Sequence, residues 1–181
     1  MTLLILGLAL WWAAHLFKRL APGPRARLGD GGKALVALAV LGSVVLMVLG
    51  YRAADFVPLW YPPAWLVHVN NLLMVLAFFL FAADGTGMGF ARRMRHPQLT
   101  GFKTWAVAHL LVNGDLASVI LFGGLLAWAV VTVIVINRSQ PRPAPKPAKP
   151  GAAPKAIAGT IFAVVAVMMI HNWLGVQPWG G

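Results

Sequence analysis

The sequence predicts an all-α protein, a polytopic membrane bundle of about six transmembrane helices. Of its 181 residues, 60% are hydrophobic and only 10% are charged, and the hydrophobic residues are gathered in long runs. Soluble domains carry about 25% charged residues, and a spanning helix needs about 20 consecutive apolar residues. We therefore expect a multi-pass protein embedded in a lipid bilayer.

The apolar runs define the predicted helices in order. Most of these runs approach or reach spanning length. The run that ends at Val112 is short, but its helix is longer if it starts just after Pro97. Proline is well accepted in the first turn of a helix. Asn113-Gly114-Asp115 then indicates a break, because one helix over Thr104–Ile136 would be roughly 50 Å long against about 30 Å of hydrocarbon. The runs are Leu3–Phe17, Ala34–Tyr51, Ala64–Ala83, Thr104–Val112, Leu116–Ile136 and Ala156–Leu174.

The predicted organisation has three parts. Residues 1–137 form a five-helix membrane core, residues 138–155 a basic, Pro-rich cytoplasmic linker, and residues 156–181 a C-terminal transmembrane helix. The alternating prolines of the linker favour an extended chain and block helix formation.

The basic residues predict the orientation. If the N-terminus lies outside, every Lys and Arg except Arg52 falls in a loop on the inner side, as the positive-inside rule requires. Six helices then place the C-terminus outside too. The expected aromatic belt on the outer side consists of Trp60, Tyr61, Trp65, Trp173 and Trp179.

Composition excludes several classes of function. The net charge is +11, but the basic residues flank apolar segments, so no nucleic-acid partner is expected. The chain has no cysteine, which excludes disulfides, iron–sulfur clusters and thiolate-ligated haem. The glycine-rich "DGTGMGF" lacks the Lys-Ser/Thr of a phosphate loop and indicates a flexible turn.

Five histidines at or near membrane depth are the candidate ligands. Imidazole is the usual axial ligand of b-type haem, and haem needs two ligands that face each other. His15 with His109, or His68 with His171, would provide such a pair, while His96 lies at the inner boundary. A zinc or non-haem iron site is the alternative, although carboxylates are few. Among the nearby basic residues, Arg95 and Lys103 are candidates to pair with haem propionates.

Several motifs together resemble one family. "RHPQL" followed by "WAVAHLLVNGDLASVILFGG", the early "HLFKRLAPGPRARLGDGGKAL" and the closing "HNWLGVQPW" resemble the NnrU family of bacterial membrane proteins, which is similar to the plant enzyme 15-cis-ζ-carotene isomerase. That resemblance implies haem b held at the places of His15 and His109. It also implies supporting roles for His96 and His68, whereas His171 fits the NnrU pattern alone.

The resemblance implies a protein of the bacterial inner membrane that is linked to nitrite and nitric oxide metabolism. Its partners would be nitrogen-oxide reductase machinery, or it would act as a redox-dependent, isomerase-like protein. Two alternatives remain open. One is a cofactor-free assembly or regulatory protein. The other is a membrane methyltransferase, because "RHPQLTG" is similar to the cofactor motif of isoprenylcysteine-type enzymes, with Leu99 in place of the aromatic residue.

Overall fold

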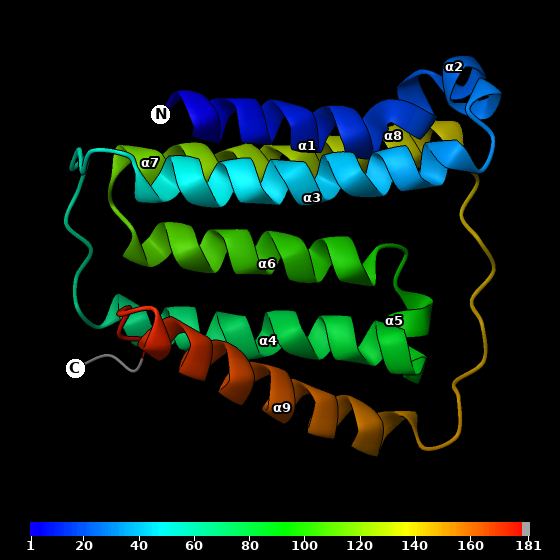
Figure 1. Cartoon of the computed structure of the whole chain (residues 1–181). Helices are drawn as coiled ribbons and strands as arrows, with labels where there is room; N and C mark the ends of the chain where they lie inside the picture. Colours follow the sequence, from blue (N-terminus) through cyan, green and yellow to red (C-terminus); the bar gives the residue numbers. More distant parts are fainter. Residues whose placement is uncertain (179–181) are drawn as a thin grey trace. The chain divides into compact units, whose positions relative to one another are not determined.

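A computed structural model describes residues 1–178, and its long elements are all helices (Figure 1). This confirms the predicted all-α, polytopic class. By length and composition, 5 helices can cross a membrane. They are α1 (Thr2–Leu20), α3 (Gly31–Arg52), α4 (Leu66–Thr86), the continuous stretch Leu116–Ser139 and α9 (Ala152–Trp173).

Helix α6 (Pro97–Val112) confirms the predicted break, because it ends at Asn113 and the next helix starts at Leu116. Its 16 residues span about 24 Å, which makes it shorter than the spanning helices. Pro97 occupies its first turn, as expected.

Three elements were not predicted. Two are short helices in the basic loops, and the third is a π-helical turn inside the stretch that follows the break. The turn separates a single helical turn, α7, from the long helix α8. The unpredicted elements are α2 (Pro22–Arg27), α5 (Gly89–Arg93) and η1 (Val119–Gly123), and η1 lies between α7 (Leu116–Ser118) and α8 (Gly124–Ser139).

The chain divides into two compact units. Unit 1 comprises residues 1–60 and 114–135, and unit 2 comprises residues 61–113 and those from 136 onward. Unit 1 contains α1, α3 and most of α8, whereas unit 2 contains α4, α6 and α9. The C-terminal helix α9 packs against α4 within unit 2.

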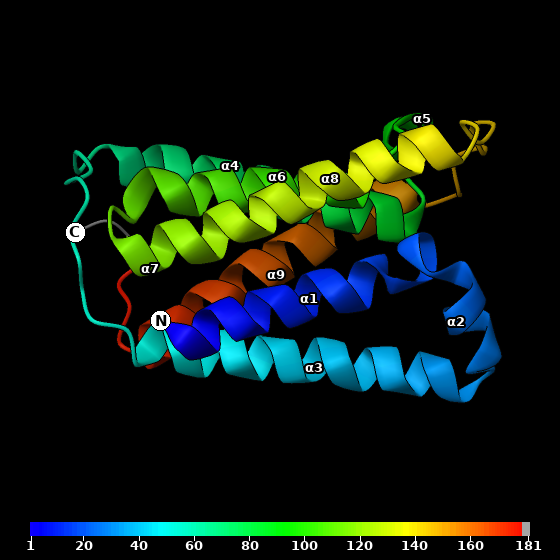
Figure 2. The ribbon, with the colours of Figure 1, turned by 90° about the horizontal axis from the view of Figure 1, so that it is seen from above.

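In unit 1, α1 and α3 run side by side in opposite directions (Figures 1 and 2). Glycines bring the two backbones together. A Cβ on Gly7 would lie 2.8 Å from the backbone nitrogen of Met47, and a Cβ on Gly50 would overlap the backbone of Leu4. Small residues of this kind allow close helix packing in lipid, where no hydrophobic effect drives helices together.

In unit 2, α4 packs against both α6 and α9, and runs opposite to both (Figure 1). A Cβ on Gly101 of α6 would lie 3.0 Å from the carbonyl oxygen of Ala77 on α4. Ala83, Ala91 and Ala156 form a small buried cluster from α4, α5 and α9. The start of α4 therefore shares one end of the unit with the C-terminal ends of α6 and α9. We call this the Leu66 end and the opposite one the Thr86 end.

Large apolar side chains on the spanning helices face outward. Leu38, Leu72 and Phe162 are 66%, 71% and 76% exposed, which suits contact with acyl chains. The residues of the predicted aromatic belt are also exposed, apart from one that lies outside the described residues. The exposed ones are Trp60, Tyr61, Trp65 and Trp173; the other is Trp179.

Gly50→Ala should destabilise unit 1 by about 2–3 kcal/mol, because the added methyl group must displace the backbone of α1. The matched control is Gly42→Ala on the same helix, where the nearest atom to a new Cβ lies 4.0 Å away. We expect the control to leave stability unchanged or to raise it by up to about 1 kcal/mol through helix propensity. Thermal unfolding of the detergent-purified protein measures both, and equal effects would contradict the close approach.

Candidate functional site

Polar side chains gather at the Leu66 end of unit 2. Asn70 and Asn71 lie in the second turn of α4, His109 lies in the last turn of α6, and His171 lies in the last turn of α9. Because α4 runs opposite to α6 and α9, these positions lie at the same end of the unit. Ionisable and amide groups in apolar helices face protein or water rather than lipid, so this cluster is the first candidate for a site.

The rings of His109 and His171 meet edge to face. Their centroids lie 6.5 Å apart and their planes are inclined by 83°. The Nδ1 of His171 lies 2.8 Å from the carbonyl oxygen of Val167. A carbonyl only accepts, so Nδ1 carries the hydrogen, and in the neutral ring Nε2 keeps its lone pair. A ligating histidine is held in the same way, with its second nitrogen donating to a carbonyl.

The C-terminal segment folds over this end of the unit. The amide nitrogen of Val176 donates to the carbonyl of His171 over 2.9 Å, and Nδ2 of Asn71 donates to the carbonyl of Pro178 over 3.1 Å. Nδ2 of Asn70 donates to Oδ1 of Asn71, while its own Oδ1 is buried and without a hydrogen-bond partner among the described residues. Such an acceptor costs about 1–3 kcal/mol, so a donor from a ligand would be favourable there.

His15 lies in unit 1, within an aromatic environment. Its Nδ1 donates to the carbonyl of Trp11 over 2.9 Å. Its ring packs on Trp11, with centroids 4.0 Å apart, and on Trp128, with centroids 4.8 Å apart. Its Nε2 therefore also keeps a lone pair. His109 belongs to unit 2, and the pairing of His15 with His109 stays a prediction.

His96 and Arg95 lie at the Thr86 end, before the first turn of α6. His96 Nε2 lies 2.9 Å from Oδ1 of Asn137, and a guanidinium nitrogen of Arg95 donates to the carbonyl of Gln140 over 2.6 Å. Along a straight helix they stand about 20 Å from His109. The structure therefore separates these two residues from the histidine pair.

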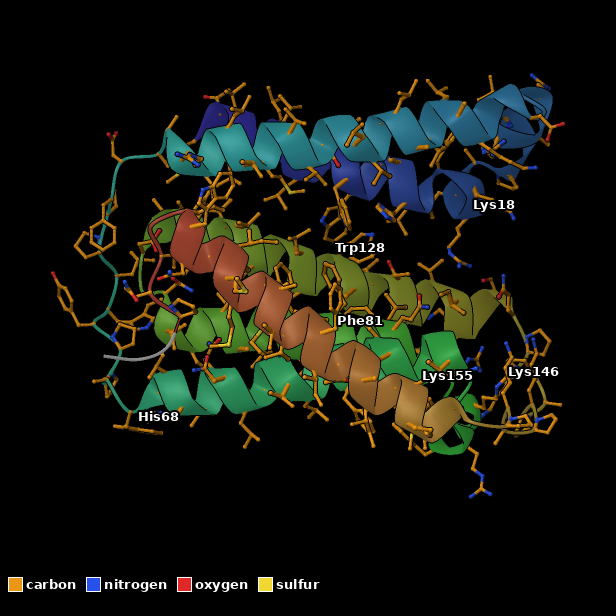
Figure 3. The ribbon with its side chains drawn as sticks, turned by 60° about the horizontal axis from the view of Figure 1, so that its bottom comes forward. Lys18, His68, Phe81, Trp128, Lys146 and Lys155 are labelled. Carbon is orange, nitrogen blue, oxygen red and sulfur yellow. The ribbon has the colours of Figure 1, made fainter. Side chains whose placement is uncertain are left out.

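The two remaining predicted residues, His68 and Lys103, contact no histidine ring among residues 1–178. His68 is exposed in the first turn of α4, and Figure 3 shows its ring directed away from α9. The ring that faces His171 is that of His109. Lys103 is half-buried midway along α6, and its pairing with a propionate stays a prediction.

Asn113 and Asp115 have capping roles. The backbone N–H and Nδ2 of Asn113 both donate to the carbonyl of His109, over 3.0 and 2.8 Å. Asp115, only 7% exposed, accepts the backbone N–H of Ser118 over 2.9 Å and the Ser118 hydroxyl over 2.5 Å. That hydroxyl in turn accepts from Tyr51 over 2.8 Å. Both polar side chains are thus satisfied by helix ends.

No group of three or more His, Asp or Glu residues within residues 1–178 is arranged to hold a metal ion. The donor set to consider is therefore a pair of imidazoles. The sequence held a signal for the His109–His171 pair, since each lies in the last turn before the end of its helix. Helices that run in the same direction between the same two levels bring such positions together. Neither predicted pair, His15 with His109 or His68 with His171, combines these two residues.

The fold and the polar cluster define a multi-pass helical membrane protein with a histidine pair near one end of a three-helix unit. The profile of the NnrU protein family matches residues 3–178, so the chain belongs to this family. Comparisons with curated proteins and with solved structures returned no significant match.

Asp115→Ala should lower the stability of unit 1 by about 2–3 kcal/mol, because it removes a helix cap and leaves the buried Ser118 hydroxyl without its acceptor. Asp55→Ala is the control, since Asp55 is exposed in the nearby loop, where a substitution shifts stability by about 0.5 kcal/mol or less. Thermal unfolding in detergent is the measurement. Equal melting temperatures for the two variants would refute the capping role.

Proposed function

We propose that this protein binds haem b at the Leu66 end of unit 2, where His109 and His171 would hold the iron. The observation that carries the proposal is the contact between these two imidazoles, which come from α6 and α9 with ring centroids 6.5 Å apart. Histidine side chains are the usual protein ligands of haem b, and helical bundles present such side chains from neighbouring helices.

The distance between the rings suits one shared ion. Metal–imidazole bonds are about 2 Å long, so two rings that bind one ion have centroids roughly 6 Å apart. The donor set also fits haem better than zinc, because zinc sites use three or four protein ligands and haem b needs only two.

Neighbouring groups of the chain orient both imidazole rings. The carbonyl of Val167 holds His171 in the tautomer that leaves Nε2 for a metal. On the α6 side, the ring of Trp105 packs beside His109 with centroids 5.1 Å apart and restricts its rotation. Bound in this place, haem b would supply one-electron redox chemistry.

Membership of the NnrU family supports a role beside nitrite and nitric oxide metabolism. We propose that the protein serves this metabolism as a haem-dependent redox component, with nitrogen-oxide reductase machinery in the same membrane as its partner. An isomerase-like activity would use the same haem and the same two histidines, so both roles depend on the proposed ligation.

A cofactor-free assembly or regulatory role is the second candidate. It is favoured by the way other polar groups are used, since His15, Asn113 and Asp115 all make hydrogen bonds that hold helices or helix ends. Under this proposal the His109–His171 contact is one more packing interaction, typically worth under about 2 kcal/mol.

Absorption spectroscopy of the purified full chain tests the haem proposal. We expect a Soret band in the wild type, and its loss or a change to a five-coordinate spectrum in both His109→Ala and His171→Ala. The control His68→Ala should keep the wild-type spectrum, because that ring is exposed.

Three outcomes would count against the proposal. The absence of a Soret band after haem supplementation would remove the cofactor. A band that survives His171→Ala but not His15→Ala would move the ligation to the other predicted pair. Unimpaired nitrite and nitric oxide reduction in cells that carry a His109→Gln variant would favour the cofactor-free role. Glutamine can replace the packing and hydrogen bonding of histidine, but it cannot replace the imidazole as a ligand of haem.

A further inference from the structure

The Thr86 end of unit 2 contains a pocket with a volume of about 440 Å³. Its wall comes from the end of α4, from α5, from the start of α6 and from the Pro-rich segment that precedes α9. Figure 3 shows Lys146 on that segment, at the opposite end of the unit from His68. The charged residues in its lining are Asp84, Arg92, Arg93, Arg95, Arg142 and Lys146.

The guanidinium groups are held in place by neutral partners. Nε of Arg92 donates to the carbonyl of Gly87 over 3.2 Å, and Arg142 donates to the carbonyl of Arg93 over 2.9 Å. Nε of Arg95 is buried and has no hydrogen-bond partner among the described residues. Carbonyl groups fix the geometry of these side chains but leave their charge uncompensated.

Within residues 1–178, these cations form no ion pair with a carboxylate. Within residues 1–178 the only ion pair joins Lys33 to Asp30 in unit 1, so no Lys or Arg of the pocket is paired with a carboxylate. Asp84 is the sole acidic residue in the lining. Several cations around one cavity repel each other, and an anion from outside would relieve that repulsion.

The start of α6 adds a second, independent attraction for anions. Pro97, Gln98 and Leu99 form its first turn and line the pocket. No side chain caps this end of the helix, and its first turn holds no acidic residue. The N-terminus of a helix carries free N–H groups and a partial positive charge, and both favour a bound anion.

We propose that this pocket binds a phosphate group, carried by the headgroup of an anionic phospholipid or free in solution. Its position at the ends of α4, α6 and α9 is where lipid headgroups lie, and basic pockets between membrane helices bind such headgroups. Its volume is within the range of about 300–1,000 Å³ for small-molecule sites. S-Adenosylmethionine, whose sulfonium is a cation, does not suit this lining.

This site is independent of the proposed haem site. His96 lines the pocket and His109 belongs to the histidine pair, and the two are about 20 Å apart along α6. Loss of phosphate binding would leave the Soret band in place, and loss of haem would leave phosphate binding in place.

Native mass spectrometry of the full chain tests the proposal, with phosphatidylglycerol, phosphatidylcholine and inorganic phosphate as separate probes. The test variant is Arg93→Gln/Lys146→Gln, whose side chains line the pocket and are exposed. The control is Arg138→Gln/Lys155→Gln, which removes the same charge from exposed residues outside the lining. Because all four side chains are exposed, both variants should keep wild-type thermal stability.

We expect the test variant to bind phosphatidylglycerol roughly 10- to 30-fold more weakly than the wild type, since each basic residue that lies against the bound headgroup contributes about fivefold. The control should bind like the wild type, and phosphatidylcholine should bind weakly to all three. Displacement of the lipid by millimolar phosphate would identify free phosphate as the source, whereas failure to displace it would identify the headgroup. Equal phosphatidylglycerol binding by test and control variants would overturn the proposal.

Discussion

The structure depends on one constraint, which is that backbone polar groups at membrane depth must find partners within the chain. The constraint is most severe where α6 ends, because the helical hydrogen-bond ladder stops there. The carbonyl of Gly114 accepts the amide N–H groups of Leu59 and Trp60 over 2.7 and 3.0 Å, and a Cβ on Gly114 would overlap the Trp60 carbonyl. Together with the caps on either side, these bonds satisfy the backbone groups where α6 ends after only 16 residues.

This helix end fixes the length of α6 within unit 2. The helix starts at the Thr86 end, beside cationic side chains, and it ends at the Leu66 end, beside an imidazole of α9. The two ends of the unit therefore differ in chemistry. One end has an excess of uncompensated positive charge, and the other has imidazole and amide groups between apolar helices. A short helix that is anchored at both ends keeps the two environments apart.

Much of this fold is predictable from the sequence, because the signals are local. Apolar runs give the helices, Pro97 gives the start of α6, and Asn113-Gly114-Asp115 gives the break with its caps. The partners of the histidines are not predictable in the same way. The polar residues of α6 are spread around the helix rather than gathered in one stripe, so its pattern does not indicate which face carries His109 inward. The short helices α2 and α5 and the π-helical turn likewise depend on packing that the pattern does not contain.

The central claim is that α6 and α9 hold the rings of His109 and His171 in contact, and it can be tested without any cofactor. The chain has no cysteine, so paired cysteine variants need no altered background. A short thiol-to-thiol crosslinker applied to membranes should join the two positions in His109→Cys/His171→Cys and leave His68→Cys/His171→Cys unjoined. Crosslinking of the second variant but not the first would contradict the account.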